Sequence, residues 1–301
     1  MSVSANDIKK KISATENMSK ITKAMQMVSV AKLNRIESRV EHFKQYYAEV
    51  ENLLHSLRTS EYIKGHPFTT DYKDEKQRQI GFVVITTNRG LVGGYNNNLL
   101  KMIKDGGSGY NSELFKIVGE RIASGGDFKF YITGQKGMNF ARSELTETQA
   151  ETYLFSDEIQ YTDIIALASK LIHDYMSGAI SEVVILYQNF VSKLTQEATQ
   201  KVLLPLKLEK VASERIPNYE INPTEEEACN NLLVQYVMTS LYEIFLSAIQ
   251  SEHAARMNAM SNATDNAEDI IKESKLIFNR ARQAAITQEL NEIVAGASAV
   301  N

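Results

Sequence analysis

The stretch TEEEACNNLLVQYVMTSLYEIFLSAIQSEHAARMNAMSNATDNAEDIIKESKLIFNRARQAAITQELNEIVA, residues 224–295, contains neither glycine nor proline. These are the two residues that break helices, so the stretch is predicted to form one long helix. Residues 1–64 form a second such stretch, because all 15 glycines and 4 prolines of the 301-residue chain come later. At about 1.5 Å per residue, the two helices would be roughly 90 Å and 100 Å long. Since no single core covers helices of this length, we expect a two-helix shaft with a smaller domain inserted between its helices.

Apolar residues in the N-terminal stretch recur at alternating steps of four and three, which is the heptad pattern of paired helices. They are Ile36, Val40, Phe43, Tyr47, Val50, Leu54 and Leu57. Toward the N-terminus the seam is expected to become small, polar or flexible, through Lys32, Ser29, Met25, Thr22, Met18, Thr15, Lys11 and Ile8. The C-terminal stretch is expected to thin in the same way, through Leu233, Val237, Ile244, Ala248, Ser251, Ala255, Asn258 and Asn262. Small seam residues predict a slender helix pair.

The middle of the chain alternates short apolar runs with helical segments. Strands are expected at 80–87, 128–133, 182–191 and 199–208, and helices at 97–104, 112–123, 135–143 and 161–177. This alternation is typical of an α/β layer with a largely parallel sheet. We therefore divide the chain into an N-terminal helix (1–64), a central α/β domain (65–223) and a C-terminal helix (224–301), with Thr224 as the N-cap of the last.

Charge and cysteine content exclude several classes of protein. The chain has 33 Lys and Arg against 37 Asp and Glu, a net charge of -4, and no region is dominated by one sign. A nucleic-acid partner is therefore not expected. Cys229 is the only cysteine, which rules out an internal disulfide or a cysteine-built metal site. The start, MSVSANDIKKKI, lacks an apolar leader region, and no apolar run is expected to span a bilayer. We expect a cytosolic or peripheral protein of bacterial origin.

A glycine-rich turn, Gly90-Leu91-Val92-Gly93-Gly94, follows a predicted strand and precedes a predicted helix. It matches neither the dinucleotide-binding pattern nor the P-loop, because no Lys-Ser/Thr pair follows Gly94. The five histidines are scattered without metal-ligand spacing, and no serine or carboxylate pair stands in a catalytic pattern. We therefore expect a structural turn, no cofactor, no metal and no intrinsic catalysis.

Residues near the two ends of the chain could contact a partner protein or serve this chain alone. Arg282 and Gln283, with Thr287 about one turn on, could present hydrogen-bond donors to a partner's loop, or they could form a solvated helix face. Met25 and Met27 could pack against a partner or within the protein. The last segment, AAITQELNEIVAGASAVN, becomes apolar again, which is expected of a tip held in an apolar collar.

Three sequence blocks carry a resemblance to a known family. They are ITKAMQMVSVAKL (21–33), TTNRGLVGGYN (86–96), and the pair SEHAARMNAMSNATDNA (251–267) and NRARQAAITQELNEIVAGASA (279–299). Over essentially its whole length the chain resembles the gamma subunit of the rotary F-type ATP synthase. It departs from the family pattern at Gln26, where Glu is usual, at Thr87-Asn88 in place of Ser-Asp, and at Val92 in place of a small residue. No cysteine-bearing regulatory insert of the chloroplast type is present.

The resemblance implies an antiparallel coiled coil of the long N- and C-terminal helices plus a central Rossmann-like α/β domain. It implies a non-catalytic central rotor stalk that transmits rotation of the membrane c-ring to the alpha/beta hexamer. Proton flow is thereby coupled to ATP synthesis or hydrolysis. The implied partners are the alpha, beta and epsilon subunits and the c-ring, without nucleic acid or direct membrane insertion. The implied location is peripheral, on the cytoplasmic side of the cell membrane.

The resemblance also implies contacts with the beta subunits at positions that match the family's coupling residues. These are Met25, Arg282, Gln283, Thr287, Arg256 and Glu289. Two other functions stay open at this point. A stand-alone α/β nucleotide-binding enzyme with helical arms would bind nucleotide by itself. A coiled-coil scaffold without a role in energy conversion would tolerate trimming of the C-terminal residues.

Overall fold

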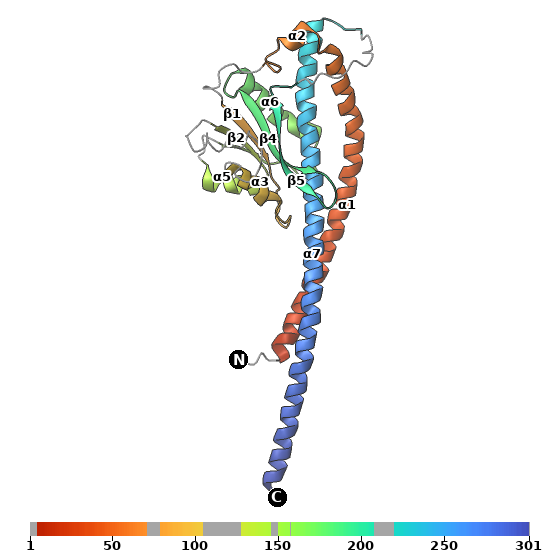
Figure 1. The fold of residues 1–301 in the computed structure, drawn as a ribbon, viewed down its shortest axis with the longest axis vertical. Coiled ribbons are helices and arrows are strands. Elements are labelled where there is room, and N and C mark those ends of the chain that lie inside the picture. Colours follow the sequence, from red (N-terminus) through yellow and green to blue (C-terminus); the bar gives the residue numbers. More distant parts are fainter. Residues whose placement is uncertain are drawn as a thin grey trace. The chain divides into compact units, whose positions relative to one another are not determined.

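The computed structural model describes residues 5–70, 79–104, 128–145, 150–156, 158–207 and 220–300 (Figure 1). Both breaker-free stretches are helical, as helix α1 (Ala5–Leu57) and helix α7 (Glu225–Val300). Helix α2 (Glu61–Lys64) follows α1 after a short turn. The predicted N-cap is confirmed, because the Thr224 hydroxyl oxygen accepts a hydrogen bond from the Glu227 backbone N–H at 3.3 Å. Three glutamates in the first turn of α7 favour the same boundary.

The chain divides into two compact units, and the border runs through both long helices. One unit comprises residues 1–31 and 256–301, and the other comprises residues 32–255. The domains expected from the sequence, 1–64, 65–223 and 224–301, follow chain segments and stay a prediction. Packing instead groups a part of each long helix with the sheet.

The smaller unit is an antiparallel helix pair. Thr22 of α1 hydrogen-bonds Thr264 of α7 through their hydroxyl groups at 2.7 Å. Six residues earlier on α1, the Glu16 carboxylate pairs with the Lys275 ammonium at 3.2 Å, which is later on α7. Partners that move in opposite chain directions define antiparallel helices. The predicted pairing of the two terminal helices is therefore confirmed.

The predicted N-terminal seam before Ile36 is confirmed at Ile8, Thr22 and Ser29 and is wrong at Lys11 and Met18. Met18 is 61% exposed and Lys11 is exposed, whereas Leu33 is only 1% exposed. The step after Ile36 is four residues, so the heptad alternation requires a step of three before it, which reaches Leu33 and not Lys32. The true seam runs through Ile8, Ile12, Thr15, Ser19, Thr22, Gln26, Ser29 and Leu33. Its small and polar character agrees with the prediction.

The predicted C-terminal seam also needs a correction. Asn262 is exposed, and the buried positions of α7 beyond residue 255 are Met260, Thr264, Ala267 and Ser274. The error has a physical cause. Between Leu233 and Ala254 α7 is buried on several faces, so the apolar residues there do not define one stripe that can be extended.

The larger unit contains a five-stranded sheet of order β3-β2-β1-β4-β5, in which only β5 is antiparallel. The strands are β1 (Ile80–Ile85), β2 (Phe128–Thr133), β3 (Ala150–Tyr153), β4 (Glu182–Phe190) and β5 (Gln196–Leu204). The helices within this domain are α3 (Tyr95–Lys104), α5 (Gln135–Glu144) and α6 (Tyr161–Met176). The predicted α/β class and four of its strands are confirmed, and β3 was missed. The helix expected at 112–123 lies outside the described residues.

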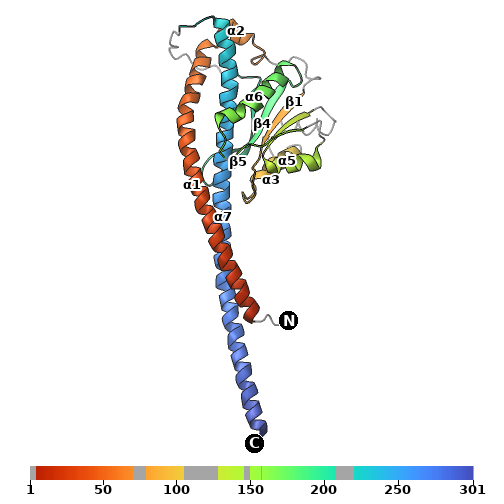
Figure 2. The same ribbon diagram turned by 180° about the vertical axis from the view of Figure 1, so that it is seen from behind.

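The two faces of the sheet are covered by different helices (Figures 1 and 2). Helices α3 and α5 enclose a core with alternate strand residues such as Phe82, Phe130 and Val184. The strand residues in between, including Tyr131, face α6, because the Tyr131 hydroxyl reaches Asp174 of that helix at 2.5 Å. Since side chains alternate along a strand, each face receives every second residue.

Among the described residues, helix α7 contains a stretch that is long and apolar enough to span a membrane, by length and composition only. More than half of that stretch, 56%, is buried inside the protein. This corrects the expectation that no apolar run would be long enough. The core helix of a soluble protein passes the same test, and the large apolar residues of α7 between Leu233 and Ala254 are largely buried.

Candidate functional site

The predicted coupling residues fall in two groups along the helix pair. Arg282, Gln283, Thr287 and Glu289 are exposed on α7, within little more than two helical turns. Met25 on α1 and Arg256 on α7 are half-buried and lie apart from this group in their helices. The Thr287 hydroxyl donates to the Gln283 backbone carbonyl at 2.9 Å, so its oxygen remains as an acceptor for a partner.

The same helices expose large apolar side chains that the coupling motif does not include. On α7 they are Ile270, Leu276, Ile277, Ile286, Leu290, Ile293 and Val294, and on α1 they include Met18, Ile21, Met27 and Val28. Contiguous exposed apolar surface marks an interaction site in a protein. The apolar tip of the sequence indicated exposed apolar side chains on α7, and the structure adds those on α1.

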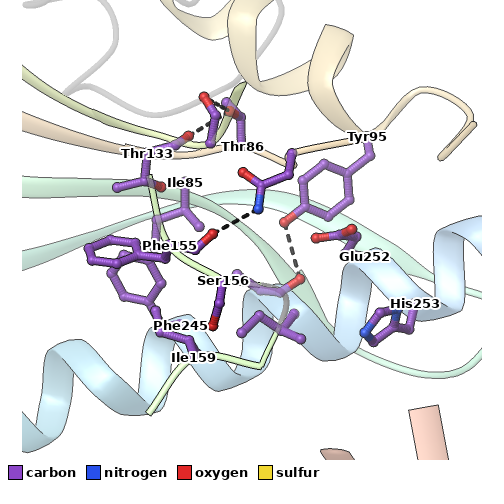
Figure 3. A pocket seen from close by; sticks show the side chains of 14 residues that line it. Ile85, Thr86, Tyr95, Thr133, Phe155, Ser156, Ile159, Phe245, Glu252 and His253 are labelled. Carbon is purple, nitrogen blue, oxygen red and sulfur yellow. Dashed lines mark hydrogen bonds between the residues drawn. The ribbon is translucent and has the colours of Figure 1, made fainter. Parts of the chain in front are cut away.

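The carboxyl edge of the parallel strands is the place where α/β folds usually bind ligands. Here it holds a cavity of about 40 Å³, whose lining includes residues of β1, β2 and α7 together with Phe155, Ser156 and Ile159 (Figure 3). The Tyr95 hydroxyl crosses toward α7 and donates to the Ala248 carbonyl oxygen at 3.1 Å. Ligand pockets usually measure about 300–1,000 Å³. This cavity is far too small for a nucleotide, so it gives no support to the nucleotide-binding enzyme.

Polar side chains of the glycine-rich turn hold the turn itself. The Thr87 backbone N–H donates to the Asn96 amide oxygen at 3.1 Å, and the Asn96 amide donates to the Thr87 hydroxyl at 2.8 Å. The Asn88 amide donates to the Phe155 carbonyl oxygen at 2.8 Å. Thr87 and Asn88 are two of the positions at which the chain departs from the family pattern, and both make structural bonds here. This geometry agrees with the predicted structural turn.

A charged network joins β2, β3 and α6 on the face of the sheet opposite α3. Asp174, whose side chain is 5% exposed, accepts hydrogen bonds from Lys129 at 2.7 Å and Lys170 at 3.0 Å. Lys129 also pairs with Glu151 at 2.9 Å. Burial alone would raise the pKa of Asp174, but hydrogen bonds from Lys129, Tyr131 and Lys170 outweigh it and lower that pKa. For Lys129, burial would lower the pKa, but its bonds to Asp174 and Glu151 raise it.

This network is structural in character. Each acid has a lysine partner, and the bonds tie an edge strand to the sheet and its helix. Sequence reasoning missed it, because its members are ordinary charged residues far apart in the chain. Across the described ranges, no group of three or more His, Cys, Asp or Glu side chains could hold a metal ion.

Comparison with protein families shows which family this chain belongs to. The sequence model of the ATP synthase family matches residues 4–300, which is nearly the whole chain. The chain belongs to the gamma family of F-type ATP synthases. The match covers both long helices and the central domain, and the role of a central rotor stalk goes with it.

Solved structures share the fold of this gamma-family chain. A Tetrahymena thermophila mitochondrial ATP synthase chain, from a central stalk and c-ring structure, is 21% identical with a TM-score of 0.58, over 81% of this chain and 99% of that one. A Euglena gracilis mitochondrial ATP synthase chain is 15% identical with a TM-score of 0.66, over 98% and 94%. A second Euglena gracilis chain, from a rotor structure, is 14% identical with a TM-score of 0.61, over 94% and 98%. At these identities the likeness concerns the fold.

Proposed function

We propose that this gamma-family chain transmits rotation of a membrane c-ring to a catalytic alpha/beta hexamer, and so couples proton flow to ATP synthesis or hydrolysis. The observation that carries the proposal is the family match over residues 4–300, because it includes the helix pair as well as the central domain. A partial match confined to the sheet would have left the shaft unexplained.

The helix pair has the properties that a rotating shaft needs. Continuous helices of 53 and 76 residues give it length without a break. The Thr22–Thr264 hydrogen bond is buried in the seam, and a single polar pair of this kind favours one register of two helices. A fixed register would prevent the two helices from sliding past each other under torque.

We propose further that the coupling residues contact loops of the beta subunits. Arg282, Gln283, Thr287 and Glu289 form an exposed cluster. The side chains of Arg282 and Gln283 offer hydrogen-bond donors to one loop, and Glu289 offers a carboxylate. Met25, half-buried on α1, and Arg256 would meet other parts of the hexamer. The exposed apolar residues of α7 around them would pack in the surrounding collar.

The remaining assignments follow from this role. We propose that the epsilon subunit and the c-ring bind the central domain, that the complex lies at the cytoplasmic side of the cell membrane, and that this chain itself does not catalyse a reaction.

The proposal is tested by purifying a tagged chain from gently solubilised native membranes, then identifying co-purified subunits and assaying ATP hydrolysis in the eluate. We expect a stoichiometric complex with two larger nucleotide-binding subunits and ATPase activity. A chain that elutes alone, and binds or hydrolyses nucleotide by itself, would contradict the rotor role.

The coupling residues need a separate test in the reconstituted complex. The double variant Arg282→Ala/Gln283→Ala is expected to lower ATP-driven proton pumping per ATP hydrolysed, with an unchanged subunit composition. Lys272→Ala is the matched control, because Lys272 is an exposed side chain on the same helix that pairs only locally with Asp269. Equal pumping by the double variant and the control would remove these residues from the coupling set.

A further inference from the structure

The central domain is attached to helix α7 by hydrogen bonds on two faces of that helix. Tyr242 and Ser247 carry these attachments, and both lie in the larger unit, residues 32–255. They are five positions apart, which at about 3.6 residues per turn places them roughly 140° apart around the helix axis. A helix that is held on one face can still turn about the line of contact, whereas a helix that is held on two faces cannot.

Arg39 of α1 makes the first attachment and joins three parts of the chain. Its Nη2 atom donates to the Tyr242 hydroxyl of α7 and, at 2.7 Å, to the carbonyl oxygen of Ile159, which lies just before α6. The Tyr242 ring also meets Tyr161 of α6 edge-on, with 5.5 Å between the ring centres. Tyr242 is only 6% exposed, and a hydrogen bond from a charged donor is about twice as strong as a neutral one. This attachment therefore fixes both long helices to the start of α6.

Ser247 makes the second attachment, to the end of strand β4. Its hydroxyl oxygen accepts a hydrogen bond from the Phe190 backbone N–H at 3.2 Å, and the hydroxyl donates to the Asn189 side-chain oxygen at 3.2 Å. The next residue of α7, Ala248, accepts the bond from the Tyr95 hydroxyl described above. Since Phe190 is the last residue of β4, these bonds connect α7 directly to the sheet.

These directed bonds hold α7 in a way that its apolar packing does not. Burial of apolar side chains is non-directional, so it opposes the separation of a helix from a sheet more than it opposes rotation of the helix. A hydrogen bond, by contrast, weakens steeply when its angle is distorted. The two attachments therefore fix the rotational position of α7 relative to the central domain.

We propose that Arg39 and Ser247 are positioning residues through which torque passes between the central domain and the two long helices. The inference rests on the rotor role proposed above. The domain is inserted between the helices and is joined to them covalently only at its two ends, so contacts such as these must carry the load. Helices α1 and α7 each continue without a break from the larger unit into the smaller one. A rotation imposed on them beside the sheet is therefore passed along both helices.

Hydrogen exchange of the Phe190 amide in the full-length chain, followed by NMR, tests the second attachment without any rotation. Ser247→Ala removes the acceptor of this amide and keeps a good helix former, so the amide should exchange about tenfold faster. Ser247→Thr keeps the hydroxyl and should exchange at the rate of the parent chain. Unchanged exchange in Ser247→Ala would show that Ser247 does not hold the sheet, and it would overturn the inference.

Proton pumping per ATP hydrolysed, measured in the reconstituted complex, tests the transmission of torque. Arg39→Met and Ser247→Ala should each lower this ratio slightly, because one attachment remains. The double variant should lower it about twofold, which is more than the two single losses together. A purely structural role would lower the yield of assembled complex or its melting temperature and leave the ratio unchanged. Tyr236→Phe is the matched control, because the Tyr236 hydroxyl accepts its bond from Tyr47 of α1, at 3.4 Å, and not from the domain.

The possible outcomes separate this inference from the rotor role. A parent complex that hydrolyses ATP without pumping protons would refute the rotor role, and the inference with it. If the parent complex pumps and the double variant pumps equally well per ATP, the inference alone is wrong. Equal losses in the double variant and in Tyr236→Phe would also overturn it, because the effect would then not be specific to the bonds between the domain and α7.

Discussion

Asp174→Asn is expected to destabilise the larger unit, because it removes the one nearly buried charge of the network. The carboxylate accepts bonds from Lys129 at 2.7 Å, Lys170 at 3.0 Å and the Tyr131 hydroxyl at 2.5 Å. Breaking a buried ion pair by removing one partner costs about 3–5 kcal/mol. Here both lysines keep a contact with Glu151, at 2.9 and 3.6 Å, and are themselves 25% and 35% exposed. Solvent screening therefore reduces the expected loss of unfolding free energy to about 2–3 kcal/mol.

The effect of Asp174→Asn should depend on pH with a definite sign. The folded-state pKa of Asp174 is lowered, so its stabilisation is fully present above the pKa of the unfolded carboxyl, about 3.9. It is lost as pH falls through the lower folded pKa. The difference in unfolding free energy between parent and variant should therefore be constant from pH 7 to about pH 5 and shrink below about pH 4.

Urea unfolding followed by near-ultraviolet circular dichroism of the 14 tyrosines measures this difference. Glu158→Gln is the matched control, because its pair with Arg35 is similarly short, at 2.8 Å, but both side chains are largely exposed. It should cost less than about 1 kcal/mol. The reasoning is refuted if Asp174→Asn is as stable as the control at pH 7. It is equally refuted if the deficit is undiminished at pH 3.5.

Three further predictions concern the backbone, the seam and the tip. Gly134→Ala should cost more than about 3 kcal/mol in thermal unfolding, because its φ is +84° and a Cβ would lie 2.3 Å from a backbone oxygen. Gly93→Ala has φ +57° with open space, so it should cost only about 1 kcal/mol; equal losses would contradict the steric argument. Thr22→Val and Thr264→Val should each lower the stability of the helix pair by about 1 kcal/mol, with the double variant close to the parent. Strictly additive losses, in thermal melts followed by far-ultraviolet circular dichroism, would exclude the interhelical bond. Removing residues 282–301 should leave the melting of the larger unit unchanged, because the described side chains 282–295 are exposed, while coupled ATP synthesis falls. Normal synthesis by the truncated chain would argue for the scaffold alternative.

The local character of the sequence was enough for the long helices and for most of the sheet. Glycine and proline disrupt a helix locally, within a turn of their own position. Because both are absent from α1 and α7, these helices could be predicted without knowing which segments pack against them. The apolar runs of β1, β2 and β4 likewise indicate buried strands by themselves. Strand β3 has the sequence AETY and no apolar run, and it becomes a strand because β2 offers it an edge to pair with.

The sequence by itself thus determined the helices, the α/β class and the family motifs, since each depends on neighbours along the chain. Tertiary structure alone decided which charges meet. Lys129, Glu151 and Asp174 come from three elements, and Arg35 reaches Glu158 across 123 residues of chain. It also decided which positions of α7 are buried, because a helix packed on several sides has no single apolar stripe. Contacts of this kind depend on the path of the chain in space, which no local pattern records.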